Sequence, residues 1–267
     1  MYEMLQHDFI RDALCACLLV GGTCAILSVY IVFRRIVFVG ITLAQISTAG
    51  VGIALFTGLN PALCAMVLSL ATVLALATTA SRANVPREAV IGVIYVASSA
   101  ATILILALSP LEHGQILDLM FGNVLTVTHS YMCFMAVVFM AIVATHFLLH
   151  RQFLFTTFDP EGACAFGYSA GVWEILFYLM MGIVISLSIK AVGTLLCFGF
   201  LVVPAVTGLL LGRRLITIFS IAISSAFISG VVGMYISYKV DLPSGPTVCA
   251  VLVVVALAAW AGSLMRR

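Results

Sequence analysis

Charged residues are scarce in this sequence, and their scarcity excludes a water-soluble fold. Asp, Glu, Lys and Arg make up 8% of the 267 residues, whereas 64% of the residues are hydrophobic. A soluble domain carries about 25% charged residues, because its surface must be polar. The chain is therefore expected to lie in a lipid bilayer. The net charge of +2 and the lack of any basic run beyond arginine pairs give no indication of nucleic-acid binding.

Zinc-protease and nucleotide-binding motifs are also missing. The sequence contains no HExxH, no dinucleotide-binding glycine fingerprint and no P-loop. Its eight cysteines form no CxxC pair and no zinc-type cluster with histidine, which favours buried apolar thiols. We expect a protein that is not an enzyme and binds no cofactor. If ATP drives it, another chain must hydrolyse that ATP.

Long apolar runs, in contrast, are abundant. A transmembrane helix needs about 20 apolar residues, and helices satisfy their own backbone groups inside lipid. The sequence thus predicts an all-α, polytopic transmembrane helical bundle of about nine spans, with eight as the alternative. Only Lys190 separates the sixth span from the seventh, which indicates a tight helical hairpin. The predicted spans are residues 13–33, 37–56, 62–80, 89–108, 130–149, 172–189, 191–211, 215–236 and 247–264.

The lysines and arginines predict the orientation of these spans. With the N-terminus outside, nine arginines fall on one side of the membrane, and Arg11, Lys190 and Lys239 fall on the other. The positive-inside rule makes the arginine-rich side cytoplasmic, and the C-terminus with it. We interpret residues 1–267 as a single transmembrane domain. Residues 1–12 are predicted to form an amphipathic segment at the membrane surface, and residues 151–170 a cytoplasmic connection.

The second predicted span carries a polar face. Thr42, Gln45 and Thr48 recur at helical spacing, and Ser47 is adjacent. A glutamine amide inside the membrane is unfavourable unless it is hydrogen-bonded. Gln45 therefore either bonds a neighbouring helix or faces an aqueous pathway for a substrate. Ionisable residues are nearly absent from the spans, which argues against a proton-coupled carrier.

The cytoplasmic connection has the pattern of a short capped helix. Asp159 suits the N-cap, Pro160 suits the first helical position, and Glu161 complements the positive end of the helix dipole. A free loop does not need such caps, whereas a helix that docks on a cytoplasmic partner does. The pattern therefore predicts a docking helix.

Several stretches, in order along most of the chain, resemble the zinc/manganese/iron ABC transporter permeases of the ABC-3 family. The resemblance implies a fold like that of type II ABC importers. It also implies the permease subunit of an ATP-driven importer for divalent metal ions (Zn, Mn or Fe) that works by alternating access. The matching stretches are Phe38–Ala54 with Gly58–Pro61, Leu119–Gly122, Phe158–Glu161 with Ala165 and Gly167, Lys190–Ala205, and Ser237–Gly245.

The same resemblance implies the partners. A cytoplasmic ABC ATPase subunit would hydrolyse ATP, an extracytoplasmic metal-binding protein would deliver the metal substrate, and a second permease would complete a homodimer or heterodimer in the bacterial inner membrane. Phe158, Asp159, Glu161 and Gly167 would couple the permease to the ATPase.

One departure from the family pattern concerns metal ligands. The family usually places Asp and His one turn apart in the second span, where this chain has Ile41 and Gln45. Isoleucine cannot bind a metal, and glutamine offers one neutral carbonyl. Three interpretations remain open: a merely polar pathway along Thr42, Gln45 and Thr48, pairing with a second permease that keeps the ligands, or another substrate. We favour a metal substrate.

Two hypotheses from other classes also stand beside the importer. A standalone secondary transporter or channel for a small solute would work without an ATPase. A membrane scaffold or sensor subunit would carry no substrate at all.

Overall fold

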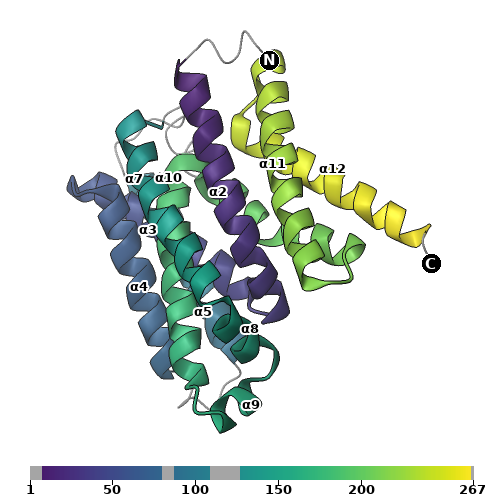
Figure 1. The fold of residues 1–267 in the computed structure, drawn as a ribbon. Helices are drawn as coiled ribbons and strands as arrows, with labels where there is room; N and C mark the ends of the chain where they lie inside the picture. Colours follow the sequence, from purple (N-terminus) through teal and green to yellow (C-terminus); the bar gives the residue numbers. More distant parts are fainter. Residues whose placement is uncertain (1–7, 80–86, 109–126, 266–267) are drawn as a thin grey trace. The chain divides into compact units, whose positions relative to one another are not determined.

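All regular structure that the computed structural model describes is helical (Figure 1). The description covers residues 8–79, 87–108 and 127–265. Seven of the helices in these ranges are long and apolar enough to cross a membrane. The apolar part of a further helix, α4 (Pro61–Thr79), is shorter and covers Pro61–Leu76. The helices are α2 (Asp8–Phe33), α3 (Val37–Thr57), α4 (Pro61–Thr79), α5 (Arg87–Leu108), α7 (His129–Leu148), α8 (His150–Phe158), α9 (Pro160–Ala165), α10 (Ala170–Leu211), α11 (Leu215–Val240) and α12 (Ser244–Leu264).

The predicted all-α transmembrane bundle is confirmed, and each predicted span falls on a helix. The sixth and seventh spans lie together in α10, which has 42 residues and is broken at Gly193. Gly193 has φ 77° and ψ 170°, a conformation that residues other than glycine essentially avoid. The break divides α10 into residues 170–192 and 194–211, and each piece approaches the length of one membrane crossing.

The N-terminal prediction is tested only in part. Residues 8–12 form the first turns of α2, continuous with the membrane-spanning helix. Residues 1–7 and the predicted outer segment with Leu119–Gly122 lie outside the described residues. The surface position of residues 1–12 stays a prediction.

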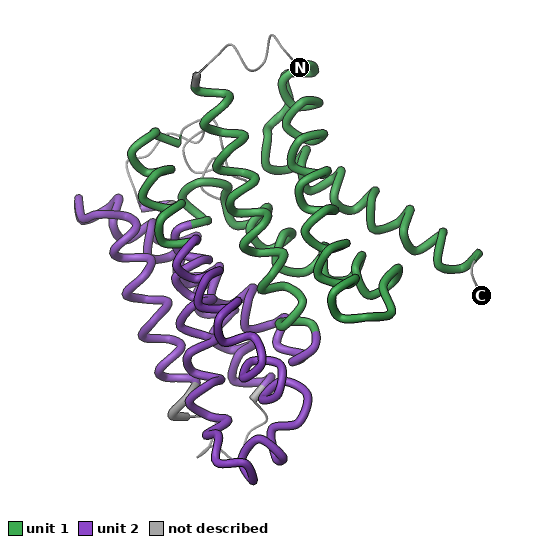
Figure 2. Tube along the Cα trace, viewed as in Figure 1, with its two compact units in different colours: residues 1–32, 112–139, 188–267 green, residues 33–111, 140–187 purple. Residues whose placement is uncertain are grey.

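The chain clusters into two compact units, each assembled from segments far apart in the sequence (Figure 2). The first unit comprises residues 1–32, 112–139 and 188–267, and the second comprises residues 33–111 and 140–187. No single cut in the sequence separates them. Whether the chain acts as one permease domain stays a prediction.

Close backbone approach characterises the first unit. A Cβ atom on Gly233 of α11 would lie 2.6 Å from the Cα of Val248 in α12. A Cβ on Gly208 of α10 would lie equally close, at 2.6 Å, to the carbonyl oxygen of Ile218 in α11. Small residues let the backbones of membrane helices approach closely. Inside lipid there is no hydrophobic driving force between helices, so van der Waals contacts of this kind stabilise their association.

The second unit is built around α3, which packs against both α4 and α5. A Cβ on Gly50 would lie 2.7 Å from the Cα of Ala65, so α3 and α4 touch through their backbones. The structure thus gives Gly50 a packing role within the chain.

Three serines join the helices of this unit in its interior. Ser47 of α3, Ser69 of α4 and Ser186 of α10 are fully buried. The Ser47 and Ser69 hydroxyls lie 2.5 Å apart, Ser186 lies 3.1 Å from Ser47, and Ser186 donates to Ser69 at 3.0 Å or to the Gly182 carbonyl at 2.7 Å. Each hydroxyl therefore finds its partners in protein, which removes the penalty of placing it in an apolar interior.

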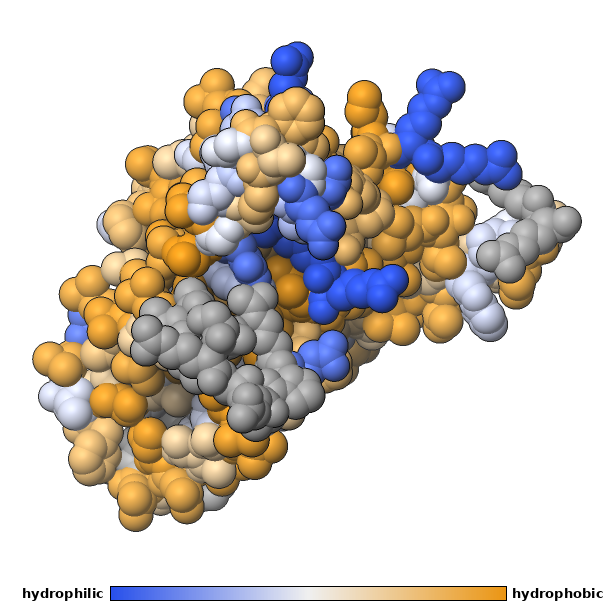
Figure 3. Space-filling model, turned by 90° about the horizontal axis from the view of Figure 1, so that it is seen from below, coloured by the Kyte–Doolittle hydropathy of each residue, from blue (hydrophilic) through white to orange (hydrophobic). Residues whose placement is uncertain are grey.

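Apolar side chains remain exposed on the outer helices, as expected for a chain surrounded by lipid. Less than a quarter of the spanning windows of α5, α7 and α12 is buried within the structure. Their exposed positions include Val93, Val137 and Leu257. The face drawn in Figure 3 is covered largely by hydrophobic residues.

Replacing Gly193 with alanine should destabilise the protein by about 1–3 kcal/mol, because a Cβ is strained in this backbone conformation. The measurement is the thermal unfolding midpoint of the purified protein in detergent. Gly262→Ala in α12 is the matched control, since a Cβ there meets no atom within 4 Å. Equal midpoints for the two variants would contradict the assignment of Gly193 as the break in α10.

Replacing Ser186 with alanine should destabilise the second unit by about 0.6–1.7 kcal/mol, the range for hydrogen bonds between membrane helices. Ser220→Ala is the control, because Ser220 is exposed and its hydroxyl donates only to Ile216 of its own helix. Unfolding in detergent by a graded denaturant measures both. A smaller loss for Ser186→Ala than for Ser220→Ala would show that the serine cluster adds no stability.

Candidate functional site

The predicted short capped helix is present as α9, and its N-terminal cap is the one that the sequence indicates. Its docking role stays a prediction. The Asp159 carboxylate accepts a hydrogen bond of 2.8 Å from the backbone N–H of Gly162. Pro160 occupies the first helical position, and Glu161 lies in the first turn. These features satisfy one unpaired N–H and place negative charge at the positive end of the helix.

The C-terminus of α9 is closed by a Schellman motif. Gly167 has φ 86°, in the left-handed region that favours glycine. Its N–H donates to the Cys164 carbonyl at 3.0 Å, and the Tyr168 N–H donates to the Ala163 carbonyl at 2.9 Å. A helix of six residues is too short to be stable alone, so caps at both ends are needed to fix its shape.

The capped helix and the residues that flank it, Phe158 at the end of α8 and Phe166 at the C-cap of α9, expose aromatic and acidic side chains. Phe158 is 53% exposed and Phe166 is 78% exposed, and Asp159 and Glu161 are exposed beside them. Ala163 is fully buried and faces the protein. Exposed aromatic side chains on a fixed, short helix are typical of a surface that another protein covers.

An aromatic cluster anchors α8, the helix that leads into α9. Phe153 is fully buried. Its ring stacks on His146 of α7 at 4.5 Å between centroids and meets Trp173 and Phe177 of α10 edge-on at 5.4 and 6.2 Å. The position of α9 is therefore set by the packing of α8 between α7 and α10.

The predicted polar face of α3 is less open than the sequence suggests. Thr42 and Thr48 are buried. Their hydroxyls donate to the carbonyls of Phe38 and Ala44, at 2.8 and 2.9 Å, within the same helix. Gln45 lies between them and is half-buried.

The two positions that hold metal ligands in the related pattern lie next to this face. Ile41 and Gln45 are both half-buried, one turn apart on α3. Among the described residues, no group of three or more His, Cys, Asp or Glu side chains could hold a metal ion. Thr42, Gln45 and Thr48 themselves carry neutral hydroxyl and amide groups.

Sequence reasoning missed the partners of Ser47. Ser69 and Ser186 come from helices far away along the chain, and nothing local relates them to α3. A single hydroxyl residue in the middle of an apolar span was the available signal, because such a group needs a hydrogen-bond partner in lipid.

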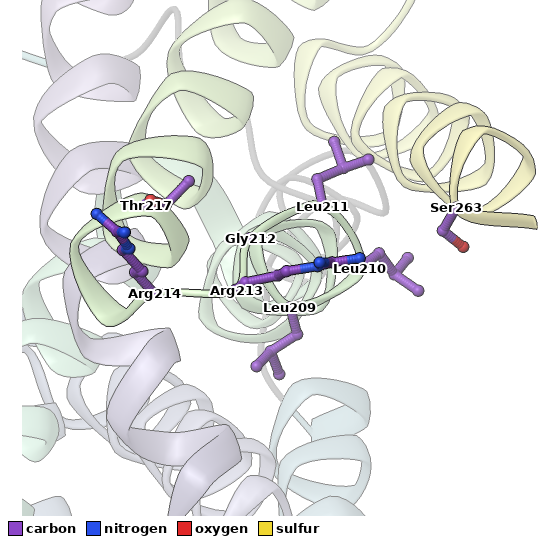
Figure 4. A pocket seen from close by; sticks show the side chains of 8 residues that line it. All are labelled: Leu209, Leu210, Leu211, Gly212, Arg213, Arg214, Thr217 and Ser263. Carbon is purple, nitrogen blue, oxygen red and sulfur yellow. The ribbon is translucent and has the colours of Figure 1, made fainter. Parts of the chain in front are cut away.

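The cavity drawn in Figure 4 is unsuited to a divalent cation. It has a volume of about 640 Å³ and lies where α10, α11 and α12 come close. Arg213 and Arg214 line it, and none of its described lining residues carries a carboxylate, imidazole or thiol. Two guanidinium groups repel a positive ion, so this cavity is not a metal site.

Known proteins of similar sequence include membrane proteins of metal transport systems. The manganese transport system membrane protein MntC of Listeria monocytogenes is 24% identical over 252 residues, covering 94% of this chain and 90% of MntC. A probable iron transport system membrane protein of Haemophilus influenzae is 27% identical over 245 residues, covering 92% of this chain and 86% of its own length.

Solved structures share the fold. A chain of PsaBC from Streptococcus pneumoniae superposes with a TM-score of 0.86 at 21% identity, over 96% of this chain and 92% of that one. An inward-facing metal-chelate type ABC transporter superposes with a TM-score of 0.77 at 14% identity, over 97% of this chain and 86% of that one. The sequence profile of the ABC 3 transport family matches residues 6–263, nearly the whole chain. The chain therefore belongs to the ABC 3 transport family.

Proposed function

We propose that this chain is the permease subunit of an ATP-binding-cassette importer for a divalent metal ion, Mn²⁺ or Fe²⁺. Family membership supports the permease role. The named relatives serve manganese and iron transport, which supports the choice of ion. Residues Arg34, Arg35, Arg151, Arg213 and Arg214 favour a cytoplasmic side that includes α9 and an N-terminus outside the cell.

The observation that carries this proposal is the double-capped helix α9 with its exposed aromatic and acidic side chains. In the proposed mechanism, an ATPase partner binds α9 around Phe158, Asp159, Glu161 and Gly167. Closure of the ATPase on ATP then moves α9, and the membrane helices open alternately to the two sides. An extracytoplasmic binding protein delivers the ion, and a second permease copy or homologue completes the pathway.

The donor atoms along α3 support a hard cation over Zn²⁺. Gln45 supplies a neutral carbonyl oxygen, and Thr42 and Thr48 supply hydroxyls. Carbonyl and water oxygens suit Mn²⁺, whereas Zn²⁺ prefers imidazole and thiolate ligands. The path we propose is therefore a polar one without a tight intramembrane site.

Charge reversal at Glu161 should uncouple ATP hydrolysis from uptake, because the docking surface then carries the wrong charge. Glu161→Lys is expected to lower ATP-dependent Mn²⁺ uptake about tenfold or more, the effect of one disrupted charged contact in an interface. Uptake is measured with radioactive Mn²⁺ in proteoliposomes that contain the permease, its ATPase and its binding protein.

Two controls separate docking from helix stability. Asp159→Asn keeps a good N-cap and removes only the charge, whereas Asp159→Ala also removes the cap and costs about 1 kcal/mol. Full uptake by Glu161→Lys would remove the docking role of α9. Uptake by the permease alone, without any ATPase, would instead favour the secondary transporter or channel.

Replacing Gln45 with leucine should lower Mn²⁺ uptake about tenfold, because an ion that passes through the membrane then lacks one carbonyl ligand. The loss of one contact to a charged group costs about 1.5 kcal/mol or more, which corresponds to about a tenfold change. Ile41→Leu on the same helix is the control and should leave uptake unchanged. The same proteoliposomes measure both variants, with Zn²⁺ as the competing ion. Equal uptake by the two variants would clear Gln45 of a place in the pathway.

A further inference from the structure

Arg34, in the turn after α2, joins several elements of the second unit. Its Nε donates to Thr157 Oγ1 at 2.8 Å, and its Nη2 donates to Thr156 Oγ1 at 3.2 Å, both on α8. Its guanidinium carbon also lies 4.8 Å from the ring centre of Phe177 on α10. One side chain thus holds α8 and α10 together, and α8 leads directly into α9.

The two threonines are oriented to accept these bonds. Thr156 donates its hydroxyl proton to the Gln152 carbonyl at 2.9 Å or to the Phe153 carbonyl at 3.3 Å, and Thr157 donates to the Phe153 carbonyl at 2.5 Å. A hydroxyl that has given its proton to its own helix keeps its lone pairs for an outside donor. The hydroxyl oxygens of Thr156 and Thr157 on α8 are therefore oriented to accept hydrogen bonds from Arg34.

Aromatic contacts support the same junction. Phe33, the last residue of α2, meets Phe158 edge-on at 5.0 Å between ring centroids. Phe158 immediately precedes Asp159, the N-cap of α9. Phe177 is fully buried, and a cation over a buried ring is held more strongly than one at an exposed ring. Movement of α9 must therefore move or break contacts with the end of α2 and with α10.

We propose that Arg34 is a positioning residue that transmits movement of the docking helix α9 to the last residue of α2 and to the part of α10 that lies in the second unit. The inference rests on the proposed function, because it assigns a step in ATP-driven transport. A planar guanidinium suits this place, since its fork reaches two hydroxyls while its face lies on Phe177. A lysine at position 34 has one compact donor group and cannot make these contacts together.

The test compares metal ions taken up with ATP molecules hydrolysed in proteoliposomes of the complete transporter. Arg34→Gln should lower this ratio about five- to tenfold, a size typical of residues that couple distant sites. ATP hydrolysis should stay within about twofold of the wild-type rate, because the docking surface of α9 is unchanged. Arg151→Gln, an exposed arginine on α8, is the matched control and should keep the wild-type ratio.

Three further variants keep the test decisive even where Arg34→Gln lowers the yield of folded protein. Thr157→Val removes one acceptor at similar size and should lower the ratio in the same direction. Arg34→Lys should recover less than half of the uptake-to-hydrolysis ratio that Arg34→Gln loses relative to the wild type. Arg34→Gln combined with Thr157→Val should lower the ratio no further than Arg34→Gln alone, because both changes break one interaction.

Hydrogen exchange gives an independent readout of position. In Arg34→Gln, the backbone amides of residues 160–168 should exchange faster than in the wild type, whereas those of α12 should not change. A wild-type ratio in both Arg34→Gln and Thr157→Val would overturn the role of Arg34. A wild-type transporter that takes up no metal with ATP would instead overturn the proposed function, so the two failures are distinct.

Discussion

This structure depends on one constraint: polar groups inside a lipid bilayer must be hydrogen-bonded within the protein, because no water is there to bond them. Each backbone amide and carbonyl inside lipid must find a partner within its own segment, and the helix is the element that provides one. Within the described residues, each predicted span lies on a helix. The single backbone break inside a described helix lies at Gly193 in α10, where glycine alone accommodates the conformation without a strained side chain.

The same constraint sorts the polar side chains. Thr42, Thr48 and Thr207 each donate a hydrogen bond to a carbonyl of their own helix. Ser47, Ser69 and Ser186 form hydrogen bonds with one another instead, and these bonds join α3, α4 and α10. Apolar packing alone would fix the relative positions of these helices less strictly. Arg34 and α9 lie at the ends of the membrane helices, where charge can meet water or a partner.

The sequence allowed prediction of those features that depend on local pattern. Apolar runs located the helices, and the order Asp159, Pro160 and Glu161 located the start of α9, because capping is decided within one turn. Contacts between distant segments could not be predicted. Ser47 and Ser186 are 139 positions apart, and Arg34 and Thr157 are 123 positions apart. Only the folded packing brings such pairs together, and a single sequence holds no record of it.

Under the proposed function, the neutral donors along α3 would let the ion leave the membrane path readily. An ion that binds tightly in mid-membrane sits in a deep well, and leaving that well slows every cycle. With isoleucine and glutamine at positions 41 and 45, such a well would be shallow. Under the proposed function, discrimination between ions would then fall to the binding protein that delivers the ion. The permease would have to open at the right point of the ATP cycle, and that task would depend on the geometry of α8, α9 and Arg34, which joins α8 to α10.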